Sequence, residues 1–452
     1  MKKDNTREKK KAISPKLDKG ITGITVGGFK SIYNEQKIEI RPLTILAGAN
    51  SSGKSSIMQP LLLLKQTLEE SFDPGALLLT GPNVKFTSTN QLFSRTSGNK
   101  NHSNIFKVGI EVDSRFNLII CFQKLNKRRG LTIHRMEWID AKKDEAVNFQ
   151  LGMKHEEIMR IIPKMLRDFY DRLKKGVKAN VEWTVVRQRC FLSLNLTVKS
   201  KKRESVLHIS PSPGSDFEPH IRKVIHLPGW RGNPEREYPM TSIAPTFHGT
   251  FEKYVATVIM QWQERKDKKL NLLIRALRIM GLTWRIATKP ISDTQVELHV
   301  GRLPHATKGR ARDMVSIADV GFGVSQILPV LVALIEAKPG QMVYIEQPEI
   351  HLHPRARYEM AQILVEAASR GIKVIAETHC KVLLRGIQTQ VANNPRLANL
   401  VKLHWFARRA EDGSTRIDSA NLDREGAFGD WPEDFDEVEL EVERQFLNSP
   451  KI

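Results

Sequence analysis

An eight-residue turn with the pattern GxxxxGK[ST] constrains this chain more than any other feature. The turn "GANSSGKS" follows the apolar stretch "LTILA" and precedes "SSIMQPLLLLKQTLEE", whose apolar spacing predicts a helix. A strand, a glycine-rich turn and a helix in this order are typical of a phosphate-binding loop. Backbone N–H groups of such a turn curl around phosphate groups, and the helix dipole adds positive potential at the same place.

The side chains of this turn have expected roles in binding ATP and Mg²⁺. We expect Lys54 to neutralise the β- and γ-phosphates and Ser55 to offer its hydroxyl to the cation. The full set of loop residues expected at the nucleotide is Gly48, Asn50, Ser51, Ser52, Gly53, Lys54, Ser55 and Ser56. A chance glycine-rich turn is the alternative, but both flanks have the required character.

Composition indicates an ordinary globular protein. The chain is 40% hydrophobic and 27% charged. No segment approaches the ~20 apolar residues that cross a bilayer, and the N-terminus lacks the apolar core of a signal peptide. The three cysteines (Cys121, Cys190 and Cys380) are far apart and odd in number, which argues against a disulfide framework and a zinc site. We therefore expect a cytoplasmic protein without membrane contact.

Charge is unevenly distributed along the chain. The net charge is +21, although the stretch 411–452 is strongly acidic. A basic body attracts polyanions, of which nucleic acid is the commonest. This favours contact with nucleic acid, directly or through a partner; scattered lysines that only maintain solubility are the alternative.

The order of β-rich and helical stretches predicts a split α/β protein. Residues 1–20 form a basic tail, and residues 21–95 contain an antiparallel ribbon and the phosphate loop. Residues 96–305 form an α+β insertion with meander strands, a hairpin and two long helices ("EEIMRIIPKMLRDFYDRLKK" and "YVATVIMQWQERKDKKLNLLIRALRIMG"). Residues 306–410 resume alternating β and α elements, and 411–452 form an acidic tail. We predict a head of two halves that share a mixed β-sheet flanked by helices.

Three further motifs lie in the second half. "DVGFGVSQILPV" is a glycine loop that opens a helix, "VYIEQPEIHLHP" is a buried strand followed by polar residues, and "IAETHC" is a strand that ends in a histidine. Together with the phosphate loop, they resemble ABC-type ATPases of the RecF, SMC/Rad50 and OLD group. "GGFKSI" is similar to the NFKS start of that group, with Gly28 where asparagine is usual. "LPGWRGNPEREYP" and "GAFGDWPEDFDE" resemble the "AAA family ATPase" branch common in bacterial defence loci.

The resemblance implies an ABC-type head and assigns roles by position. The loop that contacts the nucleotide of an opposite subunit falls on Gly321, Gly323 and Val324, with glycine where the signature serine is usual, and His353 takes the place of the D-loop aspartate. Glu346 replaces the usual aspartate and can bind Mg²⁺ through water.

Gln91 is a candidate for the Q-loop residue that reaches the metal; a surface glutamine is the alternative. His379 falls on the histidine that contacts the γ-phosphate. Gln347 occupies the position of the catalytic glutamate, and an amide orients water but cannot accept its proton. Glu349 is the obvious substitute, followed by His379, although Glu349 can equally be a structural carboxylate. We therefore expect slow ATP hydrolysis.

The resemblance also implies partners. Two or more copies are expected to assemble through composite ATP sites. The stretch after His379 is too short for a Toprim domain, and no HNH motif stands out, so a nuclease is expected on a separate polypeptide, as in systems such as PARIS and Septu. Three classes stay open: an anti-phage sensor or scaffold, a RecF-like DNA-maintenance ATPase, and a transporter subunit. For Arg231 and Arg236 in "RGNPER", packing and ion-pairing are weighed against contact with nucleotide or a partner.

Overall fold

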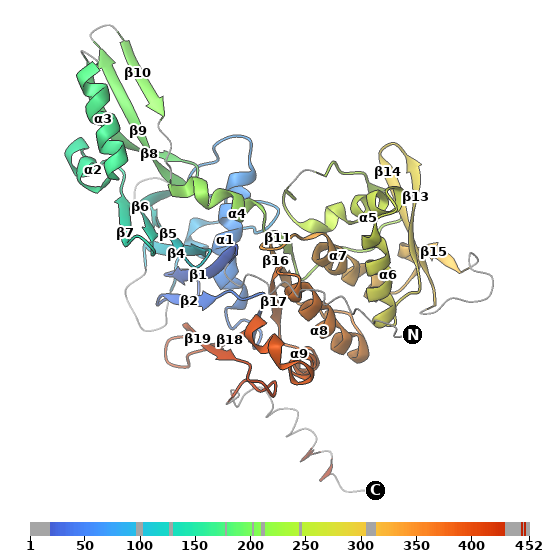
Figure 1. Ribbon diagram of the computed structural model, residues 1–452. Helices are drawn as coiled ribbons and strands as arrows, with labels where there is room; N and C mark the ends of the chain where they lie inside the picture. Colours follow the sequence, from blue (N-terminus) through green and yellow to red (C-terminus); the bar gives the residue numbers. More distant parts are fainter. Residues whose placement is uncertain are drawn as a thin grey trace, which may run out of the picture.

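Figure 1 shows a computed structural model of the chain, in which an arm projects from an α/β body. The structure describes residues 19–95, 103–125, 130–176, 179–200, 203–208, 213–243, 246–303, 313–429, 444–445 and 447–448. The expectations for the basic tail (apart from its last two residues) and for most of the acidic run lie outside these described residues.

A six-stranded central sheet joins the two halves of the sequence. Its order is β11-β16-β17-β3-β18-β19. The strands are β3 (Leu43–Gly48), β11 (Ile225–Leu227), β16 (Met342–Glu346), β17 (Lys373–Thr378), β18 (Val401–Arg408) and β19 (Thr415–Asn421). Neighbours run parallel except β18 and β19, which are antiparallel. Because β3 lies between β17 and β18, the prediction of an α/β split head with a mixed sheet is confirmed.

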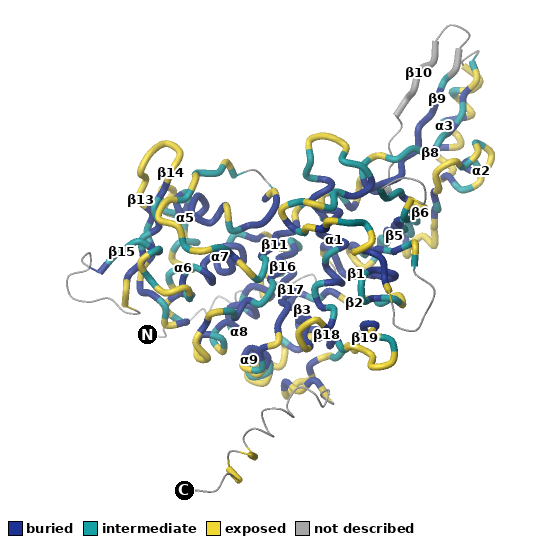
Figure 2. The backbone as a smooth tube through the Cα atoms, turned by 180° about the vertical axis from the view of Figure 1, so that it is seen from behind, coloured by how far each residue is buried: buried dark blue, intermediate teal, exposed yellow. Residues whose placement is uncertain are grey.

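The inner strands of this sheet are buried on both faces (Figure 2). Successive side chains of a strand point to opposite faces, and the two faces lie against separate apolar cores. Ile45, Ile345 and Ala376 belong to one core, whereas Leu46 and Tyr344 belong to the other. This double burial explains why these strands appear as continuous apolar runs in the sequence.

Helices cover the two faces unequally. The first face is covered by α5 (Val255–Glu264), α6 (Lys268–Ile279), α7 (Phe322–Glu336), α8 (Pro354–Ser369) and α9 (Lys381–Asn393). The second face is covered by α1 (Lys54–Glu69) and an antiparallel sheet. Among the described residues, no helix combines the length and apolar character that a membrane span needs.

The antiparallel sheet confirms the expected ribbon and meander. Its order is β2-β1-β4-β5-β6-β7. The strands are β1 (Ile21–Gly27), β2 (Gln36–Glu39), β4 (Ile105–Val112), β5 (Phe116–Lys124), β6 (Leu131–Asp140) and β7 (Glu145–Phe149). The predicted hairpin near residue 290 is also present, as β13 (Ile286–Ser292) and β14 (Gln295–Gly301), with β12 (Tyr238–Pro239) and β15 (Met314–Ser316) paired to β14.

Both long helices predicted in the insertion are interrupted. The first is divided into α2 (His155–Ile161) and α3 (Lys164–Gly176) at Pro163, because proline disfavours helical backbone in the residue before it. The second is divided into α5 and α6. At this break Lys266 has φ +51°, and the side chain of Asp267 caps α6 by accepting a hydrogen bond from the Lys269 N–H.

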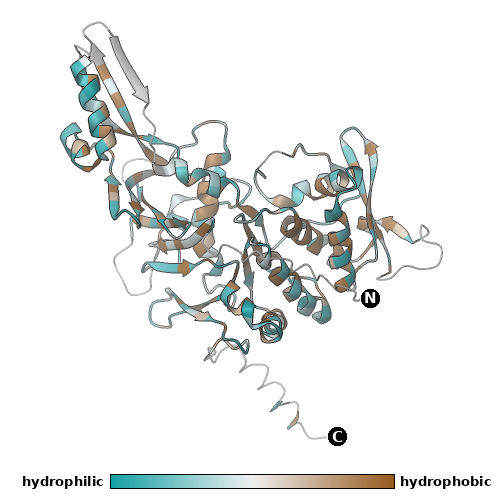
Figure 3. Cartoon of the chain, in the orientation of Figure 1, coloured by the Kyte–Doolittle hydropathy of each residue, from teal (hydrophilic) through white to brown (hydrophobic). Residues whose placement is uncertain are grey.

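The projecting arm consists of α2, α3 and a three-stranded sheet of β8 (Asn180–Gln188), β9 (Phe191–Ser200) and β10 (Arg203–His208). Leu166 and Tyr170 are the buried residues of α3, and its outward face is hydrophilic (Figure 3). The remaining short elements are α4 (Glu218–Arg222) and the 3-10 turns η1 (Thr89–Gln91), η2 (Pro213–Asp216), η3 (Phe251–Tyr254), η4 (Ile317–Asp319) and η5 (Pro395–Leu400).

Candidate functional site

The phosphate loop connects β3 to α1 as the sequence predicts. Gly48 and Gly53 have φ values of +143° and +104°, which disfavour any residue with a Cβ. A Cβ at Gly48 would also collide with the carbonyl of Phe406, and one at Gly53 with the side chain of Thr415. No side chain caps the first turn of α1, so the N–H groups of Lys54 and Ser55 face no capping side chain, whereas that of Ser56 donates to the Gly53 carbonyl.

Lys54 is held within this loop. Its ammonium donates hydrogen bonds to the carbonyls of Gly48 (2.9 Å) and Ala49 (2.7 Å). Burial lowers the pKa of Lys54, an effect that the nearby carboxylates of Glu377 and Glu349 oppose. The side chain therefore supplies positive charge at the turn where phosphate groups are expected.

Residues of β18 and β19 support the phosphate loop through hydrogen bonds. The Thr415 hydroxyl donates to the Ser52 carbonyl at 2.8 Å and lies 2.8 Å from the hydroxyl of Ser31. Arg408 donates from Nε to the Ser51 carbonyl at 2.8 Å. Sequence reasoning did not find Thr415 or Arg408, because their proximity to the loop depends on the pairing of β18 with β3.

Glu346, the predicted metal-binding residue at the end of β16, belongs to a polar cluster. Glu346 accepts a hydrogen bond from the Gly229 N–H at 3.1 Å, and its Oε1 lies 3.4 Å from His226 Nε2 and 3.4 Å from the Tyr344 hydroxyl. Burial alone would raise the pKa of Glu346, but the His226 contact and the Gly229 hydrogen bond hold it below its ordinary value. The ring of His226 is stacked on Tyr344 with a centroid distance of 5.4 Å. Glu346 is therefore held as a carboxylate.

A second glutamate, which sequence reasoning missed, joins this cluster to the phosphate loop. Glu377 on β17 is paired in register with Glu346 on β16. Its Oε1 accepts a hydrogen bond from the Ser55 hydroxyl at 2.9 Å, and its Oε2 accepts one from the Tyr344 hydroxyl at 2.8 Å. Burial, and then the charge of Glu346, raise the pKa of Glu377. The only sequence signal was an acidic residue after the apolar run "VIA" of this strand.

Gln347 and His379 lie next to each other beyond these strands. The amide Nε2 of Gln347 is 3.3 Å from Nδ1 of His379. The backbone N–H of Gln347 donates to the Glu377 carbonyl at 2.7 Å, and its φ of +47° turns the chain out of the strand. The two residues predicted to handle the attacking water and the γ-phosphate are therefore brought together.

Glu349 is held in the interior beside them. Its Oε1 accepts a hydrogen bond from the Thr378 hydroxyl, whereas its buried Oε2 has no partner among the described residues. Burial raises the pKa of Glu349. The hydroxyl of Thr378 also accepts the Cys380 N–H at 2.9 Å, so Glu349 helps to hold the turn that carries His379. Its substitution for the missing base stays a prediction.

The predicted signature loop, Gly321 to Val324, begins α7 and lies on the face of the central sheet opposite to α1. Gly321 is the N-cap of α7, Gly323 and Val324 are in its first turn, and Phe322 is half-exposed. A Cβ added at Gly321 would meet no atom within 4 Å. The rings of Phe322 and His351 are 6.2 Å apart, which brings the signature loop beside the predicted D-loop segment.

The "RGNPER" segment ties this loop to β16. Arg231 is buried and donates to the carbonyls of Glu346 (2.6 Å), Gln347 (3.2 Å) and Gln326 (3.3 Å). Burial lowers the pKa of Arg231 to about 10. Arg236 instead forms an exposed ion pair with Asp319 at 2.7 Å. Both contacts favour the structural alternative for these arginines.

His353 and Gln91, which were predicted at the nucleotide and the metal, form hydrogen bonds with backbone groups of their own segments. His353 is the N-cap of α8, where Nδ1 accepts the Arg355 N–H at 3.4 Å. The Gln91 side chain accepts the backbone N–H groups of Thr87 (2.9 Å) and Ser88 (3.3 Å) and closes a capping box over η1. Their roles at a nucleotide or metal stay predictions.

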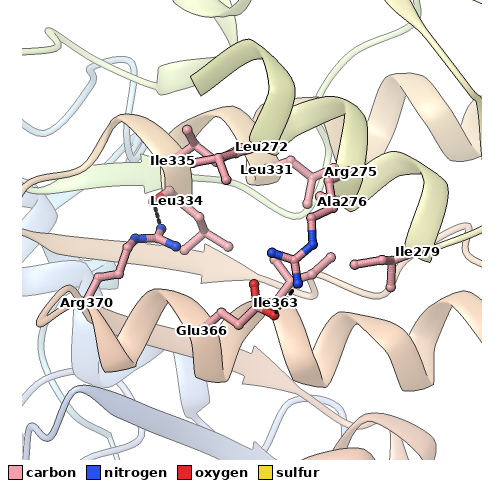
Figure 4. Close-up of a pocket in the computed structure, with 10 residues that line it drawn as sticks. All are labelled: Leu272, Arg275, Ala276, Ile279, Leu331, Leu334, Ile335, Ile363, Glu366 and Arg370. Carbon is pink, nitrogen blue, oxygen red and sulfur yellow. Dashed lines mark hydrogen bonds and ion pairs between the residues drawn. The ribbon is translucent and has the colours of Figure 1, made fainter. Parts of the chain in front are cut away.

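The described residues contain no group of three or more His, Cys, Asp or Glu side chains that could hold a metal ion. Ser55, Glu346 and Glu377 supply only oxygen ligands, which fit Mg²⁺ if phosphate oxygens and water complete the coordination. A separate small pocket of about 40 Å³ lies between α6, α7 and α8 (Figure 4). Apolar side chains, Arg370 and the Arg275–Glu366 ion pair line it, and none of the predicted nucleotide-site residues is among them.

Two family models match the chain. The model described as "AAA ATPase domain" matches residues 20–205, which include the phosphate loop. The model described as "AAA domain, putative AbiEii toxin, Type IV TA system" matches residues 282–385, which include Gly321, Glu346 and His379. Both matches identify AAA-type ATPase domains within the chain, and the phosphate loop lies in the first of them. No curated protein matches the chain.

Solved structures that match the chain include heads of SMC proteins. A structure titled as an SmcHead bound to the C-winged helix domain of ScpA has 14% identity and a TM-score of 0.45, and the match covers 89% of this chain and 98% of that one. The SMC head domain from Thermotoga maritima has 11% identity and a TM-score of 0.37, with 88% and 98% covered. An Smc head from Pyrococcus furiosus, bound to the C-terminal domain of ScpA, has 12% identity and a TM-score of 0.42, with 95% and 100% covered.

Proposed function

We propose that the chain is an ATP-binding, slowly hydrolysing ABC-type ATPase that uses Mg²⁺. Two copies sandwich ATP head to tail between the phosphate loop of one and the signature loop of the other. The ATP-bound dimer acts as a sensor or scaffold for a separate effector, such as a Toprim or HNH nuclease, in anti-phage defence.

The observation that carries this proposal is the neighbourhood of the phosphate loop. Ser55 and Lys54 lie on the loop, Ser55 contacts Glu377, and Glu346 lies beside it in register. The position that would activate water holds the amide of Gln347 at 3.3 Å from His379. This arrangement binds a nucleotide and orients water, but the amide cannot accept a proton. We therefore expect turnover well below the typical enzyme value of about 10 s⁻¹.

Dimer formation is supported by the placement of the signature loop. Residues of α7 belong to the core on one face of the central sheet, whereas residues of α1 belong to the core on the other. Gly321 and Phe322 are exposed at the start of α7. An exposed glycine loop with free helix N–H groups is suited to a γ-phosphate held by another copy.

The experiment compares Gly321→Glu with wild type. A side chain at position 321 has room in the monomer, because no atom lies within 4 Å and φ is −61°. We expect unchanged ATP binding but loss of the ATP-dependent dimer in light scattering. Gly176→Glu is the matched control, since a Cβ there also meets no atom within 4 Å. A wild-type chain that stays monomeric with ATP and Mg²⁺ would contradict the sandwich.

A RecF-like ATPase that binds DNA directly is the second candidate. The net charge of +21 favours it, and so does the arm, where α3 exposes Lys164, Arg167, Arg172, Lys174 and Lys175 against only Asp168 and Asp171. DNA binding that weakens steeply with salt and stimulates ATP hydrolysis by the purified chain would favour this candidate.

A further inference from the structure

The inference concerns Glu377, and it rests on the proposed ATPase function. Strand β17 lies between β16 and β3. Its carboxyl end therefore lies between Glu346 at the end of β16 and the phosphate loop that follows β3. Glu377 pairs with Glu346 on one side and with Leu46 on the other. The pairing of β17 in the sheet therefore fixes the direction of the Glu377 side chain, which does not depend on the conformation of a loop.

Both carboxylate oxygens of Glu377 accept hydrogen bonds from residues of the candidate site. One accepts from the Ser55 hydroxyl at 2.9 Å, and the other from the Tyr344 hydroxyl at 2.8 Å. Ser55 is the loop residue whose hydroxyl is expected to bind the cation. The Tyr344 hydroxyl also lies 3.4 Å from Glu346, so one phenol links the two carboxylates.

The charge of this pair is compensated only in part by the protein. Glu377 is 7% exposed, and the carboxyl group of its neighbour Glu346 lies 3.4 Å from the same Tyr344 hydroxyl that Glu377 contacts at 2.8 Å. Lys54 attracts Glu377, but its ammonium is hydrogen-bonded to the carbonyls of Gly48 and Ala49. Two carboxylates this close are costly to ionise in a low-dielectric interior unless a cation joins them.

We propose that Glu377 is the second carboxylate of the magnesium site, where it holds the cation together with Ser55 and Glu346. Magnesium in nucleotide sites is bound by one or two carboxylates together with phosphate oxygens and retained waters. The carboxylate binds directly or through one of these waters. In this way β17 supplies the negative charge that an amide at position 347 does not.

Loss of the negative charge of Glu377 should change the affinity for the cation and the affinity for metal-free ATP in opposite directions. With a cation, Glu377 attracts it and strengthens the ternary complex. Without a cation, the same buried negative charge repels the phosphates of ATP. Neutralising Glu377 should therefore weaken cation binding and strengthen metal-free ATP binding. A residue that only maintains the fold would change both affinities in the same direction or neither.

The test uses the full chain with Glu377→Gln, which keeps the size and hydrogen-bonding capacity of the side chain. Binding of Mn²⁺ in the presence of a non-hydrolysable ATP analogue is followed by the electron paramagnetic resonance of free Mn²⁺. Binding of the analogue in EDTA is followed by calorimetry. We expect Mn²⁺ binding to weaken by about 10–100-fold, the usual cost of losing a supporting metal contact, and binding in EDTA to improve. Glu264→Gln, an exposed glutamate at the end of α5, is the control.

Mn²⁺ affinity within twofold of wild type in Glu377→Gln would overturn the inference while leaving the proposed ATPase intact. Failure of wild type to bind the analogue with Mg²⁺ would instead overturn the proposed function. If Glu377→Gln does not fold, Glu377→Asp retains the charge on a shorter side chain. It should then show weakened Mn²⁺ binding without the gain in EDTA, and an unchanged Mn²⁺ affinity in that variant would also reject the inference.

Discussion

The side-chain amide of Gln347 lies 3.3 Å from Nδ1 of His379, at the open end of two adjacent parallel strands. Gln347 already has a φ of +47°, so a glutamate of the same length introduces no new backbone strain there. The hydrogen bond from its backbone N–H to the Glu377 carbonyl would also be retained. The residue at position 347 can therefore be exchanged with little structural cost.

We predict that Gln347→Glu accelerates ATP hydrolysis. A carboxylate next to His379 can accept the proton of the attacking water, and general-base catalysis typically contributes 10²–10⁴-fold. We expect at least a tenfold increase in phosphate release, and a shorter lifetime of any ATP-bound dimer. Gln347→Asn, which keeps the amide, is the control. Equal rates in wild type and Gln347→Glu would show that another residue, such as Glu349, already acts as the base.

Arg231 and Arg236 lie in one segment but should differ strongly in their contribution to stability. Arg231 is buried and donates to three backbone carbonyls, including that of Glu346. Arg231→Met would leave those carbonyls without donors, at about 1–3 kcal/mol for each unsatisfied group. Arg236→Met removes an exposed ion pair with Asp319, which is typically worth about 0–1 kcal/mol. Urea unfolding of both variants measures the difference; similar losses would contradict the structural role of Arg231.

The phosphate loop and its flanks could be predicted from sequence because their signals are local. The glycines, Lys54 and Ser55 are contiguous, and the apolar strand before them and the helix after them have clear periodicity. The division of the head into two halves was also visible, since alternating strands and helices resume late in the chain. The break at Pro163 also had a local signal, because proline and the residue before it disfavour helix. The sequence prediction of one long helix gave more weight to the apolar periodicity of the stretch.

The rest of the site depends on which strands become neighbours. Glu377 matters because β17 is inserted between β3 and β16, and no local pattern specifies that order. The same holds for His226, whose three-residue strand β11 was too short to recognise and joins the edge of the central sheet by pairing with β16. Arg408 and Thr415 support the loop from a hairpin more than 350 positions later. The pairing of strands that are distant in the sequence positions these side chains. No short stretch of a single sequence specifies that pairing.

Removal of the Lys54 ammonium should weaken ATP binding but leave the thermal stability of the chain nearly unchanged. Lys54 is 5% exposed, and burial lowers its pKa because the charged form loses hydration. Lys54→Met removes that cost, which offsets the loss of the hydrogen bonds to the Gly48 and Ala49 carbonyls, and it keeps an unbranched side chain of similar length. We expect ATP affinity to fall by at least about tenfold, the loss of 1.4 kcal/mol of binding energy, while Tm stays within a few degrees of wild type. Calorimetric titration with ATP and thermal unfolding measure the two effects, and retained affinity would contradict nucleotide binding at this loop.

His404 should make the head sensitive to mild acid. Its ring is fully buried on β18, with Nδ1 2.7 Å from the Ser419 hydroxyl and Nε2 2.8 Å from the Glu39 carbonyl. Burial lowers the pKa of His404 from 6.5 to about 4. The unfolded chain therefore binds a proton between these values that the folded chain does not. Its contribution to the free energy of unfolding is complete above about pH 6.5 and is lost as the pH falls toward 4.

We predict that His404→Gln, which cannot titrate but keeps polar atoms, flattens this part of the stability profile. One pKa unit corresponds to about 1.4 kcal/mol, so the shift of His404 is large enough to be resolved by urea unfolding at pH 7.0, 6.0 and 5.0. The variant should lose stability at neutral pH through imperfect hydrogen bonds, yet lose less than wild type on acidification. His134→Gln, at an exposed position on β6, is the matched control and should retain the slope of wild type. A parallel pH dependence in His404→Gln and wild type would assign the acid sensitivity to other groups.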